Sequence, residues 1–82
     1  MNWQEIRTQY PHQWLLLEAV DAHTQANHRV VEQFSVINSY PDSHQAMESY
    51  AQFHHGNPEK ELYVLHTDKE AVEILERQWL GN

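Results

Sequence analysis

The spacing of hydrophobic residues is helical at the start of the chain. Trp3, Ile6 and Tyr10 recur at intervals of three and four residues, which places them on one face of a helix. Pro11 disfavours helical geometry in the residue that precedes it. The pattern therefore predicts a short amphipathic helix over residues 2–10.

Two longer apolar segments follow, at residues 13–22 and 28–40. The first is ambiguous, because its Leu, Glu and Ala residues also form helices well. The second is rich in Val, Ile and Phe, which favours a strand. A short polar stretch at residues 23–27 separates the two segments. We therefore predict two long strands joined as a β-hairpin, which together form an extended ribbon.

A third strand is predicted by the apolar run Glu61-Leu62-Tyr63-Val64-Leu65-His66-Thr67, which has turn residues before it. Between the hairpin and this run, Pro41-Asp42-Ser43 is typical of a helix start, with Asp or Ser as the cap. The helix is expected to continue to residue 53 or 55 and to end before Gly56.

The segment after the third strand is open to two interpretations. Thr67-Asp68-Lys69-Glu70 matches a capping box, and helix formers and apolar residues continue as far as Trp79. The alternative is a further strand through Val72, Ile74 and Glu76. The capping box favours a last helix.

Together these elements predict one α+β domain over residues 1–82, with the order α-β-β-α-β-α. A helix that connects the second and third strands makes these two strands parallel. The expected sheet is a small antiparallel or mixed one of three strands, in the spatial order second, first, third, with the helices packed on one face. The second strand then has a free edge, which could pair with another copy of the chain.

Composition narrows the possible partners. The chain has 5 Lys and Arg against 12 Asp and Glu, a formal net charge of −7, and its basic residues are scattered singly. Nucleic acids and anionic membranes require clustered basic residues, so we expect neither as a partner. There is no cysteine, no signal-peptide pattern and no apolar run long enough to span a membrane. The sequence thus predicts a soluble, cytoplasmic protein without a cofactor.

Histidines are the only candidates for site chemistry. His23 and His28 flank the predicted hairpin loop near Asp21, so that these three side chains could bind a metal ion weakly. A solvated loop tip explains the same residues without a metal. His66 lies where a strand ends, a position at which ligand-binding groups often occur. A small-ligand or metal sensor that uses these histidines is therefore the alternative hypothesis.

The leading hypothesis is a non-enzymatic interaction protein. The chain has only two glycines and no strained nucleophile turn, phosphate-binding loop or dinucleotide-binding pattern. It does have three Trp and four Tyr, residue types that dominate binding energy at interfaces. We expect an interface around Trp79, Tyr40 and Phe34, formed with a second copy or with a small protein partner.

Four segments also carry a resemblance to a known family. They are Trp-Gln-Glu-Ile at residues 3–6, Tyr-Pro-His-Gln-Trp-Leu-Leu-Leu-Glu-Ala at 10–19, the third-strand run at 61–67, and Glu-Arg-Gln-Trp-Leu-Gly at 76–81. In these segments the chain resembles a family of small uncharacterised bacterial proteins that share a domain of unknown function. Genes of that family often lie beside one for a retropepsin-like aspartic protease. The resemblance implies an accessory protein and assigns no catalytic residue.

Overall fold

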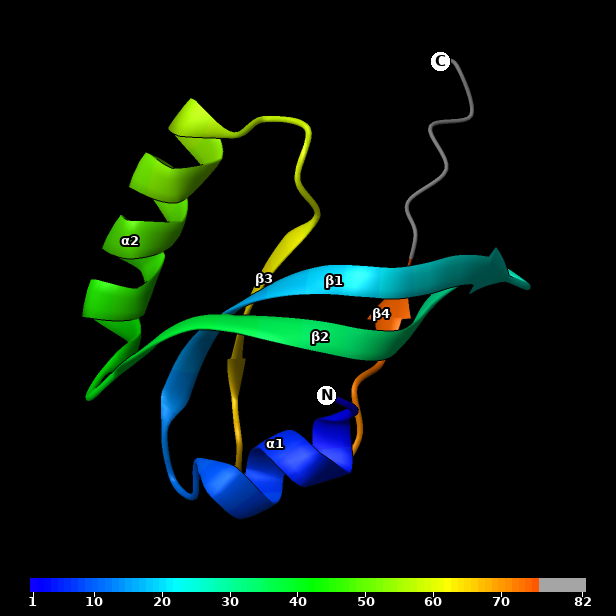
Figure 1. Ribbon diagram of the computed structural model, residues 1–82, viewed down its shortest axis with the longest axis horizontal. Helices are drawn as coiled ribbons and strands as arrows, with labels where there is room; N and C mark the ends of the chain where they lie inside the picture. Colours follow the sequence, from blue (N-terminus) through cyan, green and yellow to red (C-terminus); the bar gives the residue numbers. More distant parts are fainter. Residues whose placement is uncertain (76–82) are drawn as a thin grey trace.

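The structure, a computed structural model drawn in Figure 1, describes residues 1–75. Within that range the elements follow the order α1-β1-β2-α2-β3-β4. The helices are α1 (Trp3–Gln9) and α2 (Ser43–Gly56). The strands are β1 (Trp14–Gln25), β2 (His28–Tyr40), β3 (Leu62–His66) and β4 (Ile74–Leu75).

The strands form one sheet with the spatial order β3-β1-β2-β4. β1 is antiparallel to both of its neighbours, so β2 and β3 run parallel to each other. The predicted α+β class and the order second, first, third are confirmed. The short β4 adds beyond β2, where it pairs with the first residues of that strand.

The two strands of the β1–β2 hairpin are much longer than β3, which flanks β1 (Figure 1). β3 pairs only with the first part of β1, from Trp14 to Glu18, and the rest of the hairpin continues past it as a ribbon. Ala26 and Asn27 form the tip with φ values of 49° and 64°. Positive φ at both central residues is the signature of a type I′ turn, whose twist matches that of the two strands.

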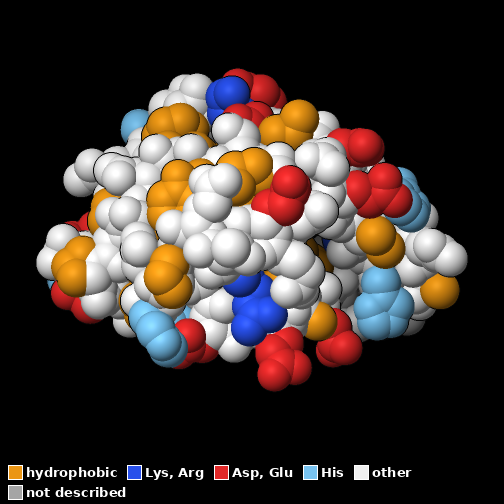
Figure 2. Space-filling view, turned by 60° about the horizontal axis from the view of Figure 1, so that its bottom comes forward, with side chains coloured by type: hydrophobic (Ala, Val, Ile, Leu, Met, Phe, Trp, Pro, Cys, Tyr) orange, Lys and Arg blue, Asp and Glu red, His pale blue; other side chains and the backbone are white. Residues whose placement is uncertain are grey.

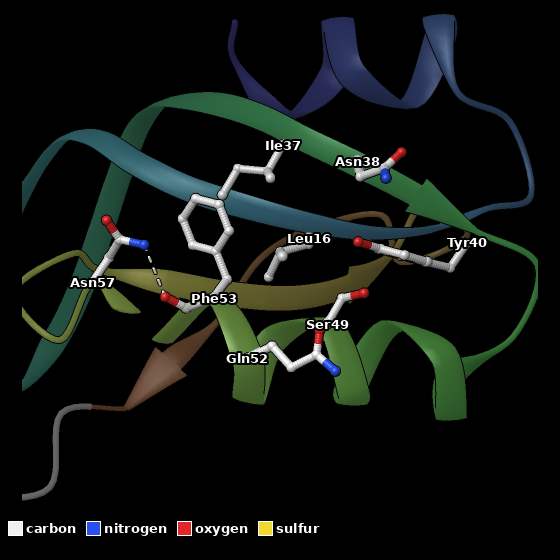
Figure 3. Close-up of a pocket in the computed structure, with 8 residues that line it drawn as sticks. All are labelled: Leu16, Ile37, Asn38, Tyr40, Ser49, Gln52, Phe53 and Asn57. Atoms are coloured by element: carbon white, nitrogen blue, oxygen red, sulfur yellow. Dashed lines mark hydrogen bonds between the residues drawn. The ribbon is translucent and has the colours of Figure 1, made fainter. Parts of the chain in front are cut away.

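The consecutive leucines of β1 bury both faces of the sheet. Leu15 and Leu17 are 0% exposed and pack with Trp3 and Ile6 of α1. Leu16 points to the opposite face, where α2 lies, and Figure 3 shows the two helices on opposite sides of the sheet. The prediction that both helices pack on one face is therefore wrong. A strand that is apolar on both faces needs cover on both.

The segment that follows β3 is not a helix at residues 68–75, contrary to the prediction. The Thr67 hydroxyl, expected to cap that helix, instead accepts a hydrogen bond of 3.0 Å from the backbone N–H of Gln13. Side chains of α1 occupy the carbonyls that follow: Arg7 donates to Thr67 O at 2.9 Å and Trp3 to Lys69 O at 2.8 Å. The alternative of a further strand is correct at Ile74, which lies in β4. Residues 76–82 lie outside the described part of the chain.

The outer edge of β2 is covered only in part, so the predicted free edge is correct for the end of the strand alone. The first two residues of β2 pair with β4. Further along, the Phe34 N–H donates to Met1 O at 2.7 Å, and Met1 N donates to Phe34 O at 3.0 Å. Within residues 1–75 no strand pairs with the outer side of β3, or with β2 beyond Arg29.

Candidate protein interface at the edge of β3

The outer edge of β3 presents backbone hydrogen-bonding groups. The inner side of the strand is bonded to the β1 segment at both ends. The Ala19 N–H donates to Glu61 O at 2.9 Å, and the Thr67 N–H donates to Gln13 O at 3.0 Å. In antiparallel pairing the direction of the backbone groups alternates along the strand. The N–H and C=O groups of the odd-numbered residues of β3 therefore point toward β1, and those of the even-numbered residues point outward. The outward backbone groups are those of Leu62, Val64 and His66.

One of those groups already has a partner within the chain. The His66 carbonyl accepts a hydrogen bond of 3.1 Å from the N–H of Lys69 in the following turn. No strand within residues 1–75 pairs with the outer side of β3. The edge can therefore accept one more strand, chiefly through Leu62 and Val64.

Leu62, Val64 and Leu65 give this edge strand aliphatic side chains. Residues 62–66 contain neither proline nor a permanently charged residue, the two features that usually prevent an edge strand from pairing. Met47 of α2 is 51% exposed and stands beside the edge. Together with Tyr50, Leu62, Tyr63 and Val64 it lines an open hollow of about 290 Å³. An added strand could bury apolar side chains in this hollow.

Opposite charges lie at the two ends of the edge. Before β3, Lys60 Nζ lies 3.4 Å from a carboxylate oxygen of Glu18. After β3, Asp68 is bound to the exposed His12 at 2.7 Å, and its side chain remains 58% exposed. On the face drawn in Figure 2, Lys and Arg side chains occupy a few separate places among scattered acidic groups, so no basic patch forms there.

A polar cluster holds β3 in place from the far side of β1. Arg29 of β2 donates to both carboxylate oxygens of Glu61, at 2.9 Å and 2.8 Å. The Tyr63 hydroxyl donates to the same carboxylate. The hydrogen bonds from Arg29 are the largest cause that lowers the pKa of Glu61 below its ordinary value, and partial burial opposes them. The sequence carries no local signal for this cluster, because Arg29 and Glu61 are brought together only by the strand order.

The candidate metal ligands do not form a site. His23 and Asp21 lie on the ribbon part of β1, and His28 begins β2 beside the turn. In residues 1–75 no three His, Asp or Glu side chains are placed so that they could hold a metal ion.

His66 is held by its neighbours. Its Nδ1 accepts a hydrogen bond of 3.1 Å from the Asp68 N–H. The His66 ring meets the Trp14 ring nearly edge-on, with centroids 5.0 Å apart. The Asp68 carboxylate lies 3.7 Å from His66 Nδ1 and 2.7 Å from Nδ1 of His12, so the imidazole belongs to a small polar group at the end of β3.

The three expected interface aromatics have different positions. Phe34 is 2% exposed and packs against Trp3 in the core. The prediction that Phe34 lies at a surface interface is therefore wrong. Tyr40 is half-buried and lines an open hollow of about 400 Å³ between α2 and the sheet (Figure 3). Trp79 lies outside the described residues.

Comparison of the chain with protein-family models, with curated proteins and with solved structures finds no match. No helix within residues 1–75 has the length and apolar character needed to cross a membrane.

Proposed function

We propose that this protein is a non-enzymatic interaction module that binds another polypeptide by adding a strand to the outer edge of β3. One observation carries the proposal: the outward backbone groups of Leu62 and Val64 lie directly beside an apolar hollow. Strand addition uses this combination, because backbone hydrogen bonds supply affinity and pockets for alternate side chains supply specificity.

The polar cluster behind β3 supports the same function. A strand that accepts a partner must stay in register while its outer side is exposed. The two hydrogen bonds from Arg29 to Glu61 fix β3 against the hairpin. A pre-organised edge binds with a smaller entropic cost than a flexible segment.

The experiment is a screen of displayed random nine-residue peptides against the immobilised protein. We expect enrichment of peptides that alternate apolar and β-branched residues. Val64→Pro removes an outward N–H and should abolish their binding. Ser39→Pro is the control, because Ser39 lies opposite Leu15 and its N–H faces the outer side of β2, where it donates to the Asn38 side chain at 2.8 Å. If no peptide is enriched, or if both variants bind equally, the proposal is wrong.

A small-ligand sensor is the second candidate. The hollow between α2 and the sheet is within the size range of small-molecule sites, and its described lining consists of apolar, amide and hydroxyl side chains. Histidine is not among these lining residues, so a histidine-based sensor has less support. Calorimetric titration with zinc, nickel and copper tests the metal version, which requires binding tighter than about 10 μM.

A further inference from the structure

We infer that the strand which adds to β3 is the β3 of a second copy of this chain, related by a two-fold axis at Val64. The inference rests on the proposed function, because it names the partner of the same edge. It is carried by three observations: the register of the outward backbone groups, the charges at the two ends, and the partial cover of the opposite edge.

The register allows the outward groups of β3 to meet those of a second β3, with the His66 carbonyl already bonded to the Lys69 N–H. In an antiparallel pair centred on Val64, this residue lies opposite the partner's Val64, and Leu62 lies opposite the partner's His66. Both members of each pair are even-numbered, so outward groups meet outward groups. Among the symmetric registers, this one aligns the whole of both strands.

The charges select the antiparallel direction. Lys60 precedes the strand and Asp68 follows it, and both side chains are accessible, at 37% and 58% exposure. An antiparallel copy brings each ammonium near a carboxylate of the other subunit. A parallel copy would instead bring like charges together at both ends, which is unfavourable.

The same arrangement covers the open hollow beside β3. Paired residues of antiparallel strands point to the same face, so α2 of both subunits would lie on one side of a continuous sheet. Met47 and Tyr50 then flank the strand contributed by the partner subunit. The exposed Met47 side chain thereby gains apolar surroundings.

Partial cover of the β2 edge makes β3 the more accessible edge. β4 pairs with one end of β2, and Met1 bonds to Phe34 farther along, so an added strand would find outward groups on β2 only beyond Phe34. Pairing of β3 with β3 about a two-fold axis uses the same edge of both subunits and therefore gives a closed dimer.

Sedimentation equilibrium over a concentration series of the whole chain tests the inference. We expect a monomer–dimer equilibrium for the wild type and for Ser39→Pro, and a monomer at all concentrations for Val64→Pro. A wild type that stays monomeric while its edge binds displayed peptides overturns the inference and leaves the proposed function standing. A dimer that persists in a folded Val64→Pro overturns the inference as well.

A charge exchange tests the register. Lys60→Glu and Asp68→Lys should each weaken the homodimer about two- to fivefold, the range for exposed ion pairs. When the two variants are mixed, opposite charges meet again at both ends, so the mixed dimer should exceed the statistical proportion. A purely statistical mixture would overturn the antiparallel register.

Amide hydrogen exchange of the wild type gives a test that needs no variant. The Leu62 and Val64 amides should become more protected as concentration rises, while the Ser39 amide stays unchanged. Concentration-independent exchange at Val64 in a sample that sediments as a dimer would overturn the inference.

Discussion

The two faces of the sheet differ in how their helices are held. α1 has only 7 residues, yet it buries Trp3 and Ile6 and places three side chains on the backbone after β3. α2 has 14 residues and buries only Ala46, with open hollows on both sides of it. Helix length therefore does not decide how firmly a helix is held. The α1 face provides stability, and the α2 face provides accessible surface.

The largest expected difference between the two faces comes from truncating one side chain of each helix. Ile6→Ala removes a fully buried side chain and should lower the free energy of unfolding by about 2–5 kcal/mol. Met47→Ala removes a side chain that is half in solvent, and should cost less than about 0.5 kcal/mol. Urea denaturation of the monomer measures both. Similar losses would mean that the two faces are equally closed.

The next effect concerns the bond that ties the α1 face to the end of β3. Thr67→Val keeps the shape of a side chain that is 3% exposed but removes the acceptor for the Gln13 N–H. The partly buried Gln13 N–H left unpaired should cost about 1 kcal/mol. Thr8→Val is the control, because the Thr8 hydroxyl donates to the Gln4 carbonyl on the exposed side of α1. Equal thermal stability of the two variants would show that the tie contributes nothing.

Removal of the N-cap should have different consequences in the two helices: local unfolding of α2, but global unfolding when the cap of α1 is lost. Asp42 accepts the Gln45 N–H at the start of α2, and Asn2 accepts the Glu5 N–H at the start of α1. Either change to Ala should cost about 1 kcal/mol. With Asp42→Ala we expect faster amide exchange confined to α2, and with Asn2→Ala a drop in global stability. Loss confined to α1 would contradict the distinction.

The smallest effect is a pH dependence at Glu61. Its pKa is lowered mainly by Arg29, so its contribution to stability is complete above its ordinary pKa of 4.5. The contribution is lost as the pH falls through the lower pKa of the folded state. Glu61→Gln should therefore flatten the acid limb of the stability profile, measured by urea denaturation across pH. Exposed Glu32→Gln removes one negative charge as the control, and should leave that limb as steep as in the wild type.

Local sequence signals predicted most of the elements. The β-branched residues of the second strand, the polar loop before it and the run at Leu62 identified three strands, and their connections gave the correct strand order. The Leu15–Leu17 run also contained the information that both faces are apolar. The prediction that both helices pack on one face does not take this information into account.

The errors at Thr67 and at the edge of β2 have a common physical cause, which is competition by distant partners. The capping box at Thr67 is a local signal, but the Thr67 hydroxyl and the carbonyls after it are taken by Gln13 and by α1. Which sheet edge is open depends likewise on Met1 and on β4, which reach β2 from distant parts of the sequence. The candidate site at β3 could not be located from the sequence for this reason.

The anchoring of α1 has a consequence for the order of events on the ribosome. α1 is synthesised before β1, whereas the carbonyls that bind its side chains belong to Thr67, Lys69 and Glu70. During synthesis α1 must therefore wait for these later residues to emerge before it can dock fully.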